Sequence, residues 1–260
     1  MTGLIASLMT ELVALLPAGL RVVGLAALAP GLSFQQAPMA VRVVLAIGLG
    51  AIIAPIAGGR HDLLDDPMRF MLLCVAELLL GMALGFAAGA VLEAMRFGGE
   101  VLDLQIGLRA GQLYDPTSGA HSGILSTAYY MTALLFFITI DGHHWLLRGA
   151  AASFSIVPVG GMGIGGDPGA LVSELGTTLL LMGLRVAAPI MGALLLADLT
   201  LGIVARAVPQ INVFLVGIPA KIALALLVAA TAAPFLMANI EQVSRLMARY
   251  LETTLRAFAG

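Results

Sequence analysis

Six long runs of apolar residues, separated by short polar breaks, make up most of this chain. Most of them approach the roughly 20 apolar residues that a helix needs to cross the hydrocarbon core of a membrane. The alternating polar and apolar positions that are typical of barrel strands do not occur. The pattern therefore predicts an all-α protein with about six long hydrophobic helices. The runs cover residues 4–28, 43–57, 70–92, 124–140, 176–197 and 222–240.

Glycine and proline mark the breaks between the runs, as is typical of turns. Four runs also contain an internal proline, which removes an intrahelical hydrogen bond and predicts a kink or a break in the helix. These prolines are Pro17, Pro55, Pro189 and Pro234.

Two stretches depart from this pattern. Residues 93–123 begin with charged residues of moderate helical character and continue as an irregular, glycine-rich loop. Loops of this size in compact proteins are often functional. After Glu241, apolar residues recur at helical spacing opposite charged ones, which predicts an amphipathic helix at a surface or against a partner.

The amino-acid composition distinguishes between membrane proteins, soluble proteins and nucleic-acid-binding proteins. Of the 260 residues, 60% are hydrophobic and 11% are charged, whereas soluble domains average about 25% charged residues. The formal net charge is −2, which excludes nucleic-acid binding through a basic surface. A single cysteine, Cys74, excludes a disulfide framework. The chain is therefore predicted to be a membrane protein without a nucleic-acid partner.

Four ionisable residues interrupt the apolar runs. They are Glu11, Arg21, Glu77 and Arg185. A charge at the depth of the hydrocarbon is costly unless it is paired or faces water. A buried Glu77 in particular needs a cationic partner such as an arginine, or else it takes up a proton. The basic residues are spread too evenly over the loops to orient the chain by the positive-inside rule.

Gly81, Gly85 and Gly89 repeat at intervals of four residues in the third run. This spacing puts them on one helix face, where another helix backbone can come close. Two interpretations stay open, namely packing against a helix of the same chain or contact with a partner subunit. In the second case Glu77, one turn earlier on this face, is buried in the contact.

Motifs for catalysis, phosphate binding or cofactors are absent from the sequence, which predicts neither an enzyme nor a cofactor. His143 and His144 follow Asp141-Gly142 at the end of an apolar run. Adjacent residues on a helix point in different directions, and further residues at metal-ligand spacing do not occur. We therefore predict no metal site here.

Residues 205–221 form a polar break between two apolar runs and predict the tip of a helical hairpin. The tip is either a solvated loop or a docking site for a partner. Its candidate interface residues are Arg206, Pro209, Gln210 and Asn212.

Here the sequence resembles the FliR/SctT family of type III secretion export components, most specifically in Pro209-Gln-Ile-Asn-Val-Phe214. Shorter pieces fall in the order that the family shows along the whole chain. Asp141-Gly142-His143 and Ser153-Phe154 followed by Pro158 look more like the flagellar branch than the injectisome branch. The other pieces are Arg21-Val22, Pro30-Gly31, Val41-Arg42, Glu77-Leu-Leu-Leu-Gly81, Gly85-Phe86, Gly98-Gly99-Glu100-Val-Leu-Asp103-Leu-Gln105-Ile-Gly107 and Tyr114-Asp115-Pro116.

The resemblance implies an inner-membrane subunit of the export gate in the flagellar basal body. In that family, such a subunit joins FliP-type and FliQ-type subunits, FlhB associates with them, and unfolded flagellar proteins pass through. It also implies one domain with a FliP-like part over about 1–175 and a FliQ-like helical hairpin and tail over about 176–260.

In the family, a loop of this subunit helps to plug the closed pore, and residues 107–116 match it here. Arg109-Ala110 stand where the family commonly has Ser-Phe, so the pore-filling side chains are expected from Leu108, Leu113 or Tyr114 instead. We expect Arg109 to pair with Asp103 or Asp115. The candidate loop residues are Gly107, Leu108, Arg109, Gly111, Leu113, Tyr114, Asp115 and Pro116.

Other functions stay open on the sequence alone. An injectisome SctT-type export subunit shares most of these features. A small-molecule secondary transporter also suits six segments with broken helices and buried charges, but the two halves show neither an inverted repeat nor a convergent polar site. An intramembrane enzyme is the weakest alternative, because the sequence lacks a nucleophile or metal constellation.

Overall fold

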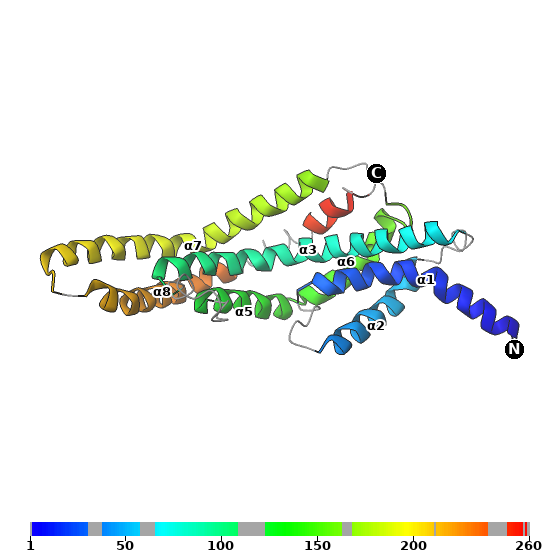
Figure 1. The fold of residues 1–260 in the computed structure, drawn as a ribbon, viewed down its shortest axis with the longest axis horizontal. Coiled ribbons are helices and arrows are strands. Elements are labelled where there is room, and N and C mark those ends of the chain that lie inside the picture. The colour runs from blue at the N-terminus through cyan, green and yellow to red at the C-terminus, as the bar shows by residue number, and fades with distance from the viewer. Residues whose placement is uncertain are drawn as a thin grey trace. The chain divides into compact units, whose positions relative to one another are not determined.

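A computed structural model of the chain describes residues 2–30, 38–57, 66–108, 123–162, 168–210, 212–238, 249–256 and 258. Within these residues the chain is all-helical and contains no strand, so the predicted fold class is confirmed. A short helical stretch over 249–256 follows the main helices. The main helices are α1 (Thr2–Leu28), α2 (Met39–Ala57), α3 (Pro67–Ile106), α5 (Ile124–Thr139), α6 (Gly142–Ile156), α7 (Pro168–Ala207) and α8 (Val213–Ala238) (Figure 1).

The helices follow the predicted apolar runs but extend beyond several of them, since α7 covers Pro168–Ala207 where the predicted run was 176–197, and α8 begins at Val213 rather than at 222. α3 continues through the charged residues as far as Ile106, because Glu, Met, Arg, Leu and Gln in this stretch are good helix formers. α6 was not predicted. Its 15 residues include two histidines, an arginine and two serines, so they never form a long apolar run.

The internal prolines do not end the helices. Pro17, Pro55 and Pro189 lie inside α1, α2 and α7 respectively. The sequence predicted a kink or a break at each proline, and of these two outcomes the break does not occur at these three positions. Each helix loses one hydrogen bond there and continues, since packing can outweigh the cost of a single proline.

The described residues belong to two compact units. Unit 1 comprises Met1–Ala90, Phe137–Leu175 and Ser244–Gly260. Its core contains Val22 and Leu25 of α1 together with Leu80 and Leu84 of α3. α1 also packs against α2, where a Cβ atom on Gly50 would lie only 3.0 Å from the carbonyl oxygen of Gly19.

The predicted amphipathic helix is confirmed in its described part, 249–256, which belongs to unit 1. Tyr250, Leu251 and Leu255 are buried there. The charged residues Arg249 and Glu252 are exposed. The apolar face of this stretch is therefore covered within the chain.

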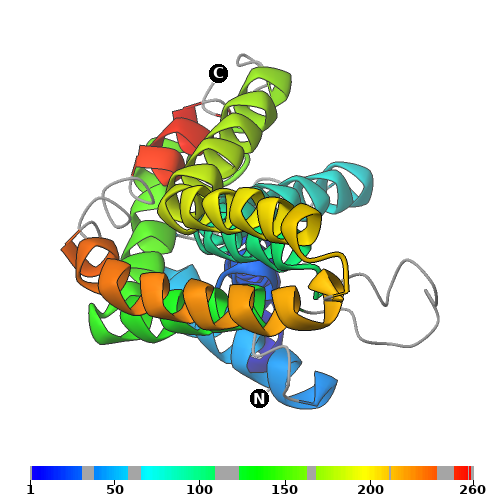
Figure 2. The ribbon, with the colours of Figure 1, turned by 90° about the vertical axis from the view of Figure 1, so that its left-hand side faces the viewer.

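Unit 2 comprises Val91–Phe136 and Gly176–Val243. α7 and α8 lie side by side in both views of the ribbon (Figure 1 and Figure 2), so the predicted helical hairpin is confirmed. The last turns of α3 and the first part of α5 pack with this hairpin. Their common core contains Leu102, Ile106, Leu125, Tyr129, Ala187, Ile190, Leu194 and Ala225.

Two described helices are long and apolar enough to cross a membrane, Pro67–Ile106 and Val172–Ala207. A third span results if α5 and α6 together count as one. Many large apolar side chains are exposed, among them Ile52 of α2 and Ile203 of α7. Exposed apolar surface on this scale is typical of proteins that face lipid or other subunits.

Candidate functional site

A buried ion pair joins α1 and α3 in unit 1. Nε of Arg21 lies 2.6 Å from Oε2 of Glu77, and each of the two side chains is 1% exposed. Removing one member of such a pair leaves an uncompensated buried charge, which is strongly destabilising. The expectation that a buried Glu77 needs an arginine is thus confirmed, and the arginine belongs to the same chain.

The end of α6 and the turn after it complete the surroundings of this pair. Nη1 of Arg21 donates hydrogen bonds to Oγ of Ser153 at 3.1 Å and to the carbonyl oxygen of Val157 at 2.8 Å. The backbone N–H of Gly160 donates to Oε1 of Glu77 at 3.0 Å. We call these five residues the Arg21 cluster. Their polar groups mainly satisfy one another, as buried charges require.

Arg21 also contacts an aromatic ring, and one of its nitrogen atoms is not hydrogen-bonded. The guanidinium carbon of Arg21 lies 4.3 Å from the ring centroid of Phe154, which is within the range of a cation–π contact. Nη2 of Arg21 is buried and has no hydrogen-bond partner. The cluster joins three segments that are far apart in the sequence, and we interpret it as the structural centre of unit 1.

The glycine face of α3 lies against α1. A Cβ atom on Gly81 would overlap the carbonyl oxygen of Arg21, and one on Gly85 would lie 2.6 Å from that of Leu25. One on Gly89 would lie 3.4 Å from the carbonyl oxygen of Leu28. In this structure the face is therefore a contact between two helices of one chain, the first of the two interpretations that the sequence left open.

The predicted hairpin tip lies between α7, which ends at Ala207, and α8, which begins at Val213. Arg206, Pro209, Gln210 and Asn212 are all exposed. The backbone N–H of Leu215 lies within hydrogen-bond distance of two oxygens of Asn212, Oδ1 at 3.3 Å and the carbonyl oxygen at 3.0 Å. Asn212 thus acts as the N-cap of α8.

Most of the candidate pore loop, residues 109–116, lies outside the described residues. Gly107 and Leu108 are described, and Gly107 has a φ of 92°, a left-handed conformation that glycine adopts without strain. Leu108 packs against the core of unit 2. The expected partners of Arg109 are not settled, because Arg109 and Asp115 also lie outside the described part.

Asp103 of α3 is fully buried and holds the start of α5. Its Oδ1 and Oδ2 accept hydrogen bonds from the backbone N–H groups of Leu125 at 3.0 Å and Ser126 at 2.9 Å. A Cβ atom on Gly123 would overlap this carboxylate. Asp103 therefore caps a helix of another segment, a role that the sequence analysis did not predict.

Polar residues also join the hairpin to α3 in unit 2. Nζ of Lys221 forms an ion pair with Asp198 and donates to the carbonyl oxygen of Gln105 at 3.3 Å. Nε2 of Gln105 donates to the carbonyl oxygen of Met191 at 3.3 Å. The sequence analysis did not predict these contacts.

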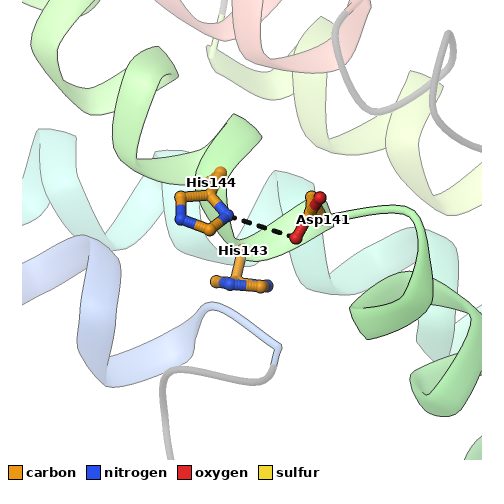
Figure 3. A group of neighbouring side chains, drawn as sticks. All are labelled: Asp141, His143 and His144. Carbon is orange, nitrogen blue, oxygen red and sulfur yellow. Dashed lines mark ion pairs between the residues drawn. The ribbon is translucent and has the colours of Figure 1, made fainter.

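Asp141, His143 and His144 lie together at the start of α6 (Figure 3). Nδ1 of His144 is 3.4 Å from Oδ1 of Asp141, and the centroids of the two imidazole rings are 4.2 Å apart. One potential ligand atom from each residue lies within 4.8 Å of the others. The two histidine side chains therefore lie closer together than we expected for adjacent residues of a helix.

Comparison with known proteins places most of the chain in one family. The sequence model of "Bacterial export proteins, family 1" matches residues 12–247. The flagellar biosynthetic protein FliR of Escherichia coli (strain K12) is 34% identical over 200 residues, which cover 77% of this chain and 76% of that protein.

Two further relatives from other bacteria give similar results. The flagellar biosynthetic protein FliR of Bacillus subtilis (strain 168) is 35% identical over 189 residues, or 70% of this chain and 73% of that protein. That of Aquifex aeolicus (strain VF5) is 25% identical over 199 residues, or 76% of this chain and 77% of that protein. The chain therefore belongs to family 1 of the bacterial export proteins, the FliR family.

Proposed function

We propose that this chain is a non-enzymatic subunit of the flagellar type III export gate. It forms part of the pore through which unfolded flagellar proteins cross the inner membrane. The observation that carries this proposal is the family match over residues 12–247, together with 34% identity to a flagellar FliR protein over 77% of this chain. The relatives that we compared are all flagellar, which favours a flagellar subunit over an injectisome one.

The proposal includes a hetero-oligomer with FliP-type and FliQ-type subunits and FlhB in the basal body. It is supported by the exposed apolar side chains, such as Leu196 and Leu199 of α7 and Leu215 of α8. Partner helices or lipid are needed to cover such a surface in the cell. We further propose that residues 1–175 are the FliP-like part and residues 176–260 the FliQ-like hairpin and tail.

Deletion of the gene from its own organism tests the main proposal. We expect loss of swimming and of secreted flagellar subunits, with both restored by the wild-type chain. The chain should also co-purify with FliP-type and FliQ-type subunits and be unstable without them. A chain that is stable as a monomer or homo-oligomer and transports a small solute would instead indicate a secondary transporter.

The pore loop is a separate proposal, for residues 107–116. A deletion of residues 112–114 in an otherwise complete assembly should raise ion leakage across the inner membrane even without export. A three-residue deletion in the break after α2, at residues 60–62, serves as the control for a shortened loop. Unchanged conductance in a fully assembled 112–114 deletion would exclude this loop from the gate but leave the subunit's role in export intact.

A further inference from the structure

Asp141 has an unusual backbone conformation at the start of α6. Its φ is 57° and its ψ is 31°, in the left-handed region, and among the described residues it is the sole non-glycine residue with a positive φ. Aspartate tolerates this conformation better than most residues, but the position remains an uncommon one.

The side chain of Asp141 does not do what aspartate commonly does at this position. Aspartate is among the preferred N-cap residues because its carboxylate accepts hydrogen bonds from the first N–H groups of a helix. Here the carboxylate makes no such cap hydrogen bond. It lies instead beside the imidazole of His144, with Oδ1 at 3.4 Å from Nδ1.

The backbone of this turn is held in place by its surroundings. The N–H of Asp141 donates to the carbonyl oxygen of Ile138 at 3.0 Å, and the carbonyl oxygen of Asp141 accepts from the N–H of His144 at 2.9 Å. A Cβ atom on Gly142 would lie 2.7 Å from the carbonyl oxygen of Phe137. The position therefore requires glycine, and the Cα atoms that carry the carboxylate and the imidazoles are fixed in advance.

The three side chains provide a donor set that suits a transition metal. Imidazole nitrogen and carboxylate oxygen bind Zn²⁺ at about 2.0–2.2 Å, so two of them on one tetrahedral ion lie about 3.4 Å apart. The Asp141 and His144 donor atoms have this separation, 3.4 Å. The ring of His143 is close enough to supply a third donor after a side-chain rotation (Figure 3).

Access to the group is open. The side chains of Asp141 and His144 are 71% and 57% exposed, so no other part of the described chain blocks an ion, and at least one coordination position is left for water or another ligand. Calcium and magnesium prefer sites made entirely of oxygen ligands. Imidazole suits zinc, copper, iron and nickel, and zinc is bound by imidazole nitrogen and carboxylate oxygen together, so two imidazoles and one carboxylate favour a transition metal such as zinc.

We propose that Asp141, His143 and His144 bind one divalent transition-metal ion of the zinc class, with at least one coordination position open. The site does not depend on the proposed export function, and measurements of metal binding alone test it. The simplest alternative is an ion pair between Asp141 and a protonated His144, with no metal involved.

Titration calorimetry with Zn²⁺ on the full chain co-purified with its partner subunits in detergent, through a tag without histidine, tests the site. We expect one ion per chain and at least tenfold weaker binding in Asp141→Asn and in His144→Ala. The matched controls are His61→Ala and His121→Ala, which remove the other two histidines of the sequence and should bind as the wild type does.

A second set of measurements separates a ligand from a residue that only supports the fold. His144→Cys replaces one zinc ligand by another and should retain binding, and Co²⁺ in this variant should show the charge-transfer absorption of a thiolate ligand. Circular dichroism checks that each variant is folded. The proposal is overturned if the wild-type chain binds no Zn²⁺, or if Asp141→Asn and His144→Ala bind as tightly as the two controls.

Discussion

The carbonyl oxygen of Arg21 occupies the position that a Cβ atom on Gly81 would need. The side chain of the same arginine pairs with Glu77, one helical turn before Gly81 on α3. Both the backbone and the side chain of one residue of α1 therefore fix its position against α3. The charge pairing depends on the close approach of the two backbones, because the absence of a side chain at Gly81 lets α1 come near enough for the guanidinium to reach the carboxylate.

A methyl group at position 81 should separate α1 from α3. For Gly81→Ala we expect a loss of about 1–3 kcal/mol of stability from overpacking, measured by thermal unfolding of the chain co-purified with its partner subunits in detergent. Gly48→Ala is the matched control, since nothing lies within 4 Å of a Cβ atom there. That control should be neutral or slightly stabilising, because alanine is the better helix former. Equal unfolding temperatures for the two variants would contradict the close packing.

Replacing either member of the buried pair of Arg21 and Glu77 should destabilise the protein more than replacing both. Arg21→Met or Glu77→Leu alone leaves a buried charge without a partner and should cost about 3–5 kcal/mol. The double variant should recover a large part of this loss, which a double-mutant cycle on unfolding measures. Arg69→Met is the control, because its pair with Asp66 is exposed and such pairs contribute about 0–1 kcal/mol. Additive single effects would argue against a direct interaction.

Removal of the Asp103 carboxylate should loosen the start of α5. Asp103→Ala leaves the N–H groups of Leu125 and Ser126 without their acceptors, at a cost of about 1–3 kcal/mol. Hydrogen exchange at these two amides should become at least tenfold faster. Asp103→Asn keeps one acceptor oxygen and should show a smaller change. Wild-type exchange rates in Asp103→Ala would mean that other groups hold this helix end.

Asn212 offers a way to separate helix capping from docking at the hairpin tip. Asn212→Leu removes the cap of α8, at a cost of about 1 kcal/mol, and we expect it to reduce swimming. Asn212→Ser retains a capping oxygen but changes the exposed surface. If swimming follows capping, the serine variant should swim normally. If both variants assemble but fail to swim, the asparagine side chain itself contacts a partner.

Some parts of this structure follow from the sequence and others depend on three-dimensional packing. The helices follow from long apolar runs, and the hairpin from the polar break between two of them. The pair of Asp198 and Lys221 was predictable in principle. Asp198 lies nine residues before the end of α7 and Lys221 lies eight residues after the start of α8, so an antiparallel hairpin brings them together.

The choice of Arg21 as the partner of Glu77 was not predictable in the same way. The two residues are 56 positions apart, so the sequence does not indicate which positions of α1 and α3 face each other. Arg42 and Arg185 were equally possible partners for Glu77. The choice depends on which helix packs against the glycine face. The grouping of Asp141 with two adjacent histidines was missed for a related reason, because it depends on a left-handed turn that is set by the contact of Gly142 with Phe137.

The length of α3 limits how the protein can sit in a bilayer. With 40 residues and a rise of 1.5 Å per residue, the helix is about 60 Å long, whereas the hydrocarbon layer is about 30 Å thick. The charge of Glu77 is compensated, but Glu93, Arg96, Glu100 and Asp103 follow within the last turns. The helix is thus divided along its axis into a longer, mainly apolar part and a charged last part over residues 93–106, rather than into two faces. A layer about 30 Å thick can hold only about half of a straight helix of this length, and the apolar part suits such a layer better than the part with Glu93, Arg96, Glu100 and Asp103.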